Sequence, residues 1–240
     1  MSQEITINET IVAEMARLGI LTGHKRSKTH PKMRPYIGAT KNEVELLDPE
    51  ATLHGLRAAK EMAQKIIAQG GVILCVGTVP AAKEIVKTFA VTYGFPYVTN
   101  RWIGGTLTNF SIIMTRLKYY LDLQMKKERG DLAKYTKKEQ GAFGKDINAM
   151  SKLFEGLRTL TRLPDALLIV DIDAHATAVR EARQLHIPVI ALLDTDDDPT
   201  MVTVPIFAND HSVQSIRWVF EKIQEGILRP QSGIKSEDTL

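Results

Sequence analysis

The stretch VILCVG, residues 72–77, is a continuous apolar run that ends in glycine. Such runs are typical of strands that are buried on both faces within a parallel sheet. A helix is predicted directly after it, from Pro80 to Tyr93, and a second strand at residues 96–99. Strand, helix and strand in this order predict a parallel α/β sheet.

The same alternation continues towards the C-terminus. Apolar strands are predicted at residues 166–171, 188–194 and 204–207, and helices at about 175–185 and 212–225. We therefore expect an α/β fold built on a doubly wound parallel sheet of the flavodoxin or Rossmann type.

The N-terminal part adds further elements around a basic segment. Helices are predicted at about residues 8–21 and 48–69, and a strand at residues 44–47. The basic segment, residues 24–41, contains six Lys and Arg residues and no acid. Because two prolines interrupt it, we expect this segment to be irregular and exposed.

Residues 108–162 show helical periodicity instead of strands. Two runs of apolar residues recur at steps of three and four, which is the spacing of a coiled-coil seam. We expect an α-helical hairpin, inserted between strands and projecting from the α/β body. Gly104-Gly105 is expected to turn the chain out of that body, and Thr106 or Thr108 to cap the first helix. The seam residues are Phe110, Ile113, Leu117 and Tyr120 in the first run, and Phe143, Ile147, Met150, Phe154 and Leu157 in the second.

The charges of the chain are segregated along its length. The overall net charge is +3, but residues 24–41 and residues 116–162 each carry +6, which leaves the remainder with −9. Segregated positive charge attracts a polyanion, because each phosphate that is neutralised releases a counterion. The alternative for both segments is a solvated surface without a ligand.

Two stretches could carry phosphate chemistry. The loop at residues 77–80 follows a strand and precedes a helix, but it lacks the G-x-G-x-x-G spacing, which favours a plain turn. Asp171-x-Asp173 ends a strand, as in haloacid-dehalogenase-like phosphotransferases, and residues 194–198 could supply further carboxylates for Mg²⁺. The favoured interpretation is that both aspartates cap the next helix and that the acidic run is a solvated turn.

A zinc site is not expected from the spacing of the histidines. The six histidines show no H-E-x-x-H pattern, and the single cysteine, Cys75, is expected to be buried in a strand. His24 and His30 lie in the basic segment, where contact with phosphate or a base is more plausible than metal ligation. The N-terminus has no secretion signal and no run is long enough to span a membrane, so we expect a cytoplasmic protein.

Four ordered blocks of the sequence resemble one known family. The segment RWIGGTLTNF, residues 101–110, resembles a signature of the bacterial-type small-subunit ribosomal protein two family, and the other blocks follow that family's order. Together they span nearly the whole chain. The other blocks are GH (23–24) with HPKMRPYI (30–37), LPDALLIVD (163–171) with EARQLHIPVIALLDT (181–195), and DPTMVTVPIFANDHSVQSI (198–216).

The chain also departs from that family's pattern. Thr29-His30 replaces a tryptophan–asparagine pair, and Gly38-Ala39 replaces phenylalanine–glycine. Most departures cluster in the basic segment, which indicates a divergent lineage.

The resemblance implies a non-enzymatic, structural constituent of the small ribosomal subunit in the cytoplasm. Such a protein binds small-subunit rRNA at the head–body junction and supports docking of the multi-OB-fold ribosomal protein that captures messenger RNA. No cofactor, metal, membrane or small-molecule substrate is expected. The implied organisation is an α/β domain at 1–105 and 163–228, the inserted hairpin at 106–162, and a flexible tail at 229–240.

The RNA-binding residues are expected in three places: the basic segment, the start of the signature, and the hairpin with its tip. Trp102 is expected to pack at the joint between domains. The RNA-binding candidates are Lys25, Arg26, Lys28, His30, Lys32, Arg34, Arg101, Arg116, Lys118, Lys126, Lys127, Arg129, Lys137 and Lys138.

Two alternatives remain at this point. The first is a phosphohydrolase that uses Asp171 and Asp173 with Mg²⁺. The second is a free-standing interaction module that uses the helical hairpin to bind another protein.

Overall fold

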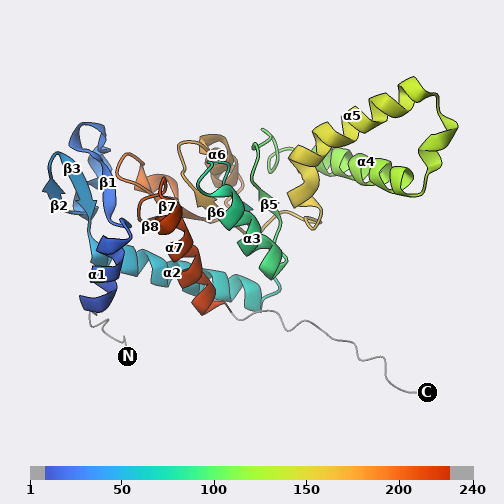
Figure 1. The fold of residues 1–240 in the computed structure, drawn as a ribbon. Coiled ribbons are helices and arrows are strands. Elements are labelled where there is room, and N and C mark those ends of the chain that lie inside the picture. The colour runs from blue at the N-terminus through green and yellow to red at the C-terminus, as the bar shows by residue number, and fades with distance from the viewer. Residues whose placement is uncertain (1–8, 228–240) are drawn as a thin grey trace, which may run out of the picture.

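The structure, a computed structural model, describes residues 9–227 (Figure 1). The expected start of the first helix at Asn8 and the expected tail at 229–240 lie outside the described residues. Within them, helix α1 covers Glu9–Arg17 and ends before the predicted boundary at residue 21.

Five strands form a parallel sheet in the order β5-β4-β6-β7-β8. The prediction of an α/β fold with a parallel sheet is therefore confirmed. Every pairing in this sheet is parallel. The strands are β4 (Ile73–Val76), β5 (Tyr97–Val98), β6 (Ala166–Val170), β7 (Val189–Leu193) and β8 (Val204–Phe207).

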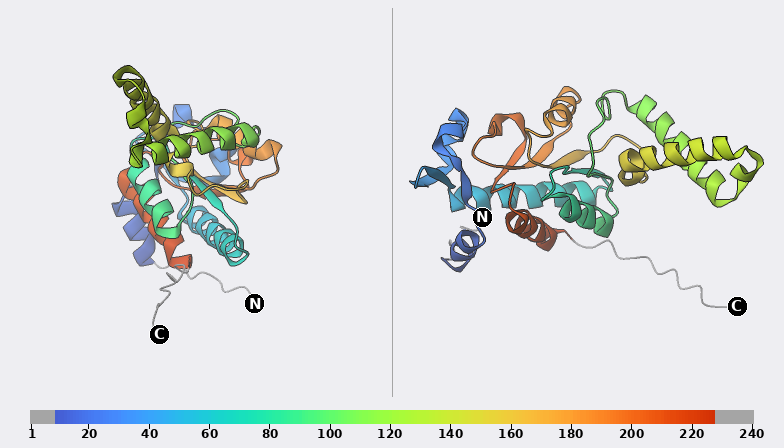
Figure 2. Two further views of the ribbon diagram at one scale, coloured as in Figure 1. Left: turned by 90° about the vertical axis from the view of Figure 1, so that its right-hand side faces the viewer. Right: turned by 45° about the horizontal axis from the view of Figure 1, so that its top comes forward.

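The strand order makes the sheet doubly wound. The chain passes from β4 to β5 on one side and later returns through β6 to β7 on the other. Because parallel crossovers are right-handed, the helices of these two connections cover opposite faces. They are α3 (Lys83–Tyr93) and α6 (Ala176–Gln184). Helix α7 (Val213–Gly226) packs beside α3 (Figure 2).

Helix α2 (Pro49–Ala68) runs along the far edge of this sheet and packs on β8. Its start follows from the sequence, since Asp48 accepts a hydrogen bond from the Glu50 amide and proline occupies the first turn. Thr52 Oγ1 donates to the Phe207 carbonyl over 2.6 Å, which ties the helix to the strand.

A second, antiparallel sheet corrects the prediction for the basic segment. Strands β1 (Thr22–Lys25) and β2 (Ile37–Lys41) both flank β3 (Val44–Leu47), in the order β1-β3-β2. Between β1 and β2 lie two 3₁₀ helices, Arg26–Lys28 and Pro31–Tyr36. The prediction of an irregular segment was wrong because backbone pairing needs no apolar pattern: β2 has four exposed residues out of five.

Two further helices leave the sheets and extend to one side (Figure 1). They are α4 (Phe110–Glu128) and α5 (Lys137–Phe154), and we call them the α4–α5 pair. Helix α5 begins at a capping box in which Thr136 and Glu139 satisfy each other's amides, so the helix forms despite its two glycines. The remaining helices and the two sheets are called the body below.

The predicted apolar seam does lie between the two helices of the α4–α5 pair. Ile113, Leu117 and Tyr120 of α4 are buried, as are Ile147 and Phe154 of α5. The rings of Tyr120 and Phe154 lie 6.4 Å apart, centre to centre. The classification of the pair as a coiled coil stays a prediction.

The predicted caps of α4 were wrong. The N-cap position is Asn109, and its side chain makes no capping hydrogen bond. Thr106 Oγ1 donates to the Ile103 carbonyl, while Thr108 contacts Glu181 of α6. Both threonines therefore stabilise the loop before α4 and not its first turn.

The interior of the molecule is apolar, and Cys75 lies within it. The thiol is completely buried in β4, as predicted, and burial raises its pKa. Among the described residues, no helix combines the length and the hydropathy that a bilayer crossing requires.

Candidate nucleic-acid interface

The basic segment presents an exposed cluster of cations at one end of the body. Lys25 ends β1, and Arg26 and Lys28 form the 3₁₀ helix that follows it. These three side chains and Arg34 are exposed, and none of them has an ion-pair partner between residues 9 and 227. They are free to contact a polyanion.

Two other candidates in this segment are engaged within the protein. Lys32 Nζ lies 2.8 Å from both Asp198 Oδ2 and Thr200 Oγ1. Burial alone would raise the pKa of Asp198, but the bonds from Lys32 and Thr200 outweigh it and lower the pKa to about 2. His30 is half-buried, and its Nδ1 accepts a hydrogen bond from the Lys32 amide.

The α4–α5 pair carries the second cluster of cations. Lys126 forms an ion pair with Asp122 one turn earlier, with 2.7 Å between Nζ and Oδ2. Ion pairs of this type on an exposed helix are weak, so they compete little with RNA. All predicted cations of this region are exposed: Arg116, Lys118, Lys126, Lys127, Arg129, Lys137 and Lys138.

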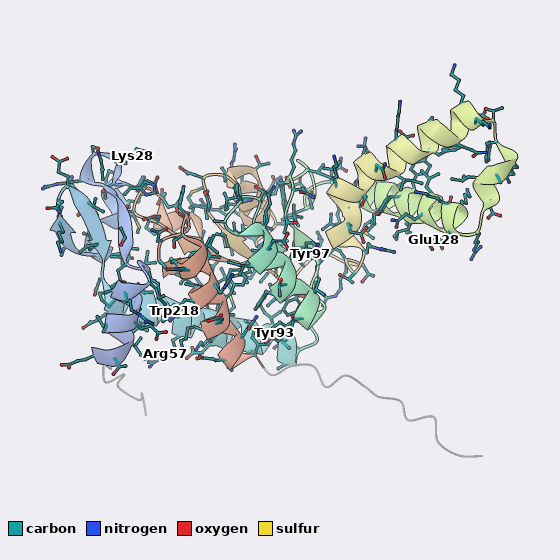
Figure 3. All side chains as sticks on the ribbon, in the orientation of Figure 1. Lys28, Arg57, Tyr93, Tyr97, Glu128 and Trp218 are labelled. Carbon is teal, nitrogen blue, oxygen red and sulfur yellow. The ribbon has the colours of Figure 1, made fainter. Side chains whose placement is uncertain are left out.

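The two clusters lie at opposite ends of the molecule. Figure 3 labels Lys28 at one end and Glu128, the last residue of α4, at the other. Arg101 is exposed on the loop between β5 and α4. Two exposed cations that the sequence analysis missed, Arg180 and Arg183, lie on α6 between the clusters (Figure 1). Their spacing of three on a predicted helix was a signal that could have identified them.

The joint between the body and the α4–α5 pair contains Trp102, as expected. Its side chain is buried, and its Nε1 donates to Glu181 Oε1 over 3.1 Å. Arg101 points outward while its neighbour is buried, so one dipeptide supplies both a surface cation and a packing residue.

The acidic run at residues 194–198 is not a solvated turn, and that prediction is corrected. Asp194 and Asp197 are 1% and 2% exposed. The Asp194 amide donates to Asp197 Oδ2 over 3.0 Å. Burial, followed by the carboxylate of Asp210, raises the pKa of Asp197 to about 9. The run lies beyond the end of β7, where the fold packs it against other loops.

His24 belongs to this acidic corner and not to the exposed cluster. Its Nδ1 lies 3.3 Å from Asp194 Oδ2 and 3.3 Å from Asp196 Oδ1. Its amide donates to Thr195 Oγ1 over 2.8 Å. The expectation that His24 would contact phosphate or a base was therefore wrong, because its imidazole faces carboxylates of the same protein.

The same corner brings together three groups that could hold a divalent cation. Ligand atoms of His24, Asp194 and His211 lie within 4.8 Å of one another. Within the described residues, His24 Nδ1 is shielded from solvent and makes no hydrogen bond of acceptable geometry, although two carboxylate oxygens lie 3.3 Å away, which fits a ligand role. Imidazole nitrogen and carboxylate oxygen are donors that Zn²⁺ accepts. These three possible ligands were not identified from the sequence, because they are far apart in the chain and come from separate loops and strands.

The geometry of Asp171 does not suit a phosphatase nucleophile. Asp171 is 8% exposed, has a positive φ of 66°, and accepts a hydrogen bond from the Ala174 amide through Oδ1. Its carboxylate therefore stabilises the turn before α6, but the prediction that it caps the helix was wrong, because the N-cap is His175, whose side chain makes no capping hydrogen bond. Asp173 is exposed as a residue, but partial desolvation of its carboxyl group, followed by the carboxylate of Asp196, raises its pKa.

Comparison with known proteins identifies the family. The model of the ribosomal protein S2 family matches residues 15–229. The chain belongs to the ribosomal protein S2 family. The small ribosomal subunit protein uS2 of Roseiflexus sp. is 40% identical over 88% of this chain and 80% of that protein.

Two other relatives match along nearly the whole chain. The small ribosomal subunit protein uS2 of Rhodopirellula baltica is 37% identical over 95% of this chain and 87% of its own length. The protein of the same name from Thermus thermophilus is 37% identical over 98% of this chain and 90% of its own length. The S2 family consists of structural ribosomal proteins, so the prediction of a non-enzymatic ribosomal protein is confirmed, and the phosphohydrolase alternative is set aside.

Proposed function

We propose that this S2-family chain is built into the small ribosomal subunit as an RNA-binding structural protein that contacts rRNA through two separate basic surfaces. The observation that carries the proposal is the position of exposed cations at both ends of an otherwise acidic molecule. The first surface comprises Lys25, Arg26, Lys28 and Arg34, and the second comprises Arg101 with the cations of the α4–α5 pair.

Two surfaces separated by the body suit a protein that bridges two parts of a folded RNA. Exposed lysines and arginines bind the phosphate backbone and respond to its shape rather than to sequence. The head–body junction of the small subunit is a place where two RNA segments meet, and we assign the chain to it. His30 and Lys32 are assigned a supporting role, because both are already engaged within the protein.

The domain organisation follows the same division. We assign residues 1–105 and 163–228 to one α/β domain and 106–162 to an inserted coiled-coil hairpin. The buried seam between α4 and α5 supports this assignment. The inserted unit extends the reach of the protein on the RNA, while the α/β domain offers a surface to neighbouring proteins.

The test is sedimentation of small subunits with charge variants. Wild-type chain is expected to travel with the small subunit and to dissociate as salt rises. Neutralising three cations of either surface, as in Lys25→Gln/Arg26→Gln/Lys28→Gln or Arg116→Gln/Lys118→Gln/Lys127→Gln, is expected to shift dissociation to lower salt.

A matched control removes the same charge from the body. Arg57 and Lys65 are exposed on α2 and Arg217 is exposed on α7, away from both surfaces. Their replacement by glutamine should leave sedimentation unchanged. If this control weakens binding as much as the surface variants do, net charge explains the result; if wild-type chain never enters the subunit, the proposal fails.

We also propose that the bound chain supports docking of the multi-OB-fold ribosomal protein that captures messenger RNA. Membership of the ribosomal protein S2 family supports this part of the proposal. Subunits lacking the chain should bind that protein more weakly, and adding the chain back should restore binding. Equal binding with and without the chain would contradict this part of the proposal.

A further inference from the structure

The side chain of Glu181 on α6 organises the joint between the body and the α4–α5 pair. It is 7% exposed and forms no ion pair with any residue in the range 9–227. Oε1 accepts from Trp102 Nε1 at 3.1 Å and from the Gly105 amide at 2.8 Å. Oε2 accepts from the Leu107 amide at 2.9 Å and from the amide and hydroxyl of Thr108 at 3.1 and 3.2 Å.

These five hydrogen bonds keep the carboxylate charged although it is buried. Burial would raise the pKa of Glu181, but the donors from Trp102, Leu107, Gly105 and Thr108 together outweigh it, and the pKa is lowered. Hydrogen bonds to a charged acceptor are roughly twice as strong as bonds between neutral groups. A buried carboxylate with five donors and no cation therefore fixes the positions of those donors strongly.

All five donors belong to the loop that leads into α4. Residues 99–109 contain turns but no helix or strand, so regular backbone pairing does not determine their path. Gly105 has a positive φ of 87°, which reverses the chain where the carboxylate binds it. Two of the amides that it binds, those of Leu107 and Thr108, come directly before the N-cap of α4.

The second connection between the body and the α4–α5 pair is made without charge. A Cβ added at Gly156 would lie 2.1 Å from the Tyr97 carbonyl oxygen, so the chain after α5 packs directly on the backbone of β5. Asn100 Nδ2 donates to the Lys152 carbonyl over 2.9 Å. The α4–α5 pair is thus attached to the body at two points, the loop bound by Glu181 and the contact of Gly156 with β5. The first attachment restrains rotation of the pair about the second.

We propose that Glu181 is the positioning residue that sets the direction of the α4–α5 pair relative to the body. This inference rests on the proposed function: by setting that direction, Glu181 aligns the second basic surface with the first, so that both surfaces can bind one rRNA. It acts through the loop at residues 102–108 and does not itself contact RNA.

The test measures the orientation of the pair in the free protein. Spin labels at Glu61→Cys on α2 and Ala142→Cys on α5 report one distance across the joint, and both positions are exposed. The native Cys75 is completely buried and does not react. Glu181→Gln keeps the shape of the side chain, but its amide nitrogen cannot accept, so at least two of the five hydrogen bonds are lost.

The distance distribution is expected to broaden in Glu181→Gln, with the circular dichroism of the helices retained. Trp102→Phe and Thr108→Val each remove side-chain donors and should broaden it less, and they replace Glu181→Gln if that variant does not fold. The matched control is Glu225→Gln, whose carboxylate pairs with Lys222 on α7. The proposal is overturned if the distance distribution of folded Glu181→Gln, or of both milder variants, is as narrow as that of wild type.

Binding to small subunits gives the second readout. Glu181→Gln is expected to bind about tenfold more weakly than wild type, because a loop that loses hydrogen bonds to the carboxylate no longer holds the two basic surfaces in alignment. If wild type does not bind subunits at all, the proposed function fails while the distance measurement still decides the role of Glu181. Broadening without weaker binding would overturn the alignment of the two surfaces.

Discussion

The imidazole of His175 connects two loops at the carboxyl ends of neighbouring parallel strands. Its Nε2 accepts a hydrogen bond from the Thr78 amide over 3.1 Å. Nδ1 must therefore carry the proton, and it donates to the Asp171 carbonyl over 2.6 Å. The ring is 1% exposed, so a second proton would place an unpaired charge in the interior.

We expect this residue to make stability depend on pH. Burial lowers the pKa of His175 from its ordinary value of 6.5. The unfolded chain consequently binds the proton more readily than the folded protein, and the free energy of unfolding should fall as pH drops below 6.5. Urea unfolding of wild type and His175→Gln between pH 5 and pH 7.5 measures this dependence.

The variant should lose less stability on acidification than wild type does. His54→Gln is the control, because His54 is exposed on α2. Parallel pH profiles for wild type and His175→Gln would show that His175 does not titrate on unfolding.

Among the elements, α2 and α5 place glycine in opposite environments. Gly55 of α2 packs on β8, and an added Cβ would lie 2.3 Å from the Pro205 carbonyl oxygen. Gly141 of α5 has open space around the same position. The first glycine permits close packing of a helix on a strand, whereas the second only weakens its helix.

Alanine substitution should therefore change stability in opposite directions. Gly55→Ala is expected to lower the free energy of unfolding by about 1–3 kcal/mol or more, because backbone must move. Gly141→Ala is expected to raise it by about 0.5–1 kcal/mol. Chemical denaturation of both variants measures the difference, and a Gly55→Ala protein as stable as wild type would contradict the packing described here.

Elements that are defined by a local sequence pattern could be predicted, whereas elements that depend on pairing with distant residues could not. The strands of the parallel sheet are apolar runs, and β8 was predicted with its observed bounds of Val204–Phe207. Strands β1 and β2 were missed because their side chains are basic or exposed and only backbone pairing defines them. The turn between β2 and β3 has positive φ at Asn42 and Glu43, without a glycine to signal it.

The site residues divide in the same way. Exposed cations are recognisable from charge alone, and all predicted ones except His30 are exposed. The acidic corner and the role of Glu181 depend on contacts between residues 73 to 187 positions apart, as from Thr108 to Glu181 and from His24 to His211. No local pattern encodes such contacts, so they became visible only in the folded molecule.

For the whole molecule, the separation of its two basic surfaces has a measurable consequence in salt. Each phosphate contact contributes about 0.7–0.9 to the slope of log affinity against log salt. Neutralising three cations on either surface should therefore reduce the slope by about 2, and neutralising both sets by about 4. Filter binding of rRNA fragments between about 50 and 200 mM salt measures the slopes.

Additive losses would show that both surfaces bind the same RNA at once. A loss confined to one set would assign the contacts to that surface alone. The control variant at Arg57, Lys65 and Arg217 should keep the wild-type slope.

The joint at Glu181 also has a consequence for the order of events during synthesis. The carboxylate lies 73 to 79 positions after the donors that it binds. Helices α4 and α5 are therefore complete in the chain before α6 is synthesised. A chain that ends between residues 154 and 181 would hold both projecting helices but lack the carboxylate that sets their direction.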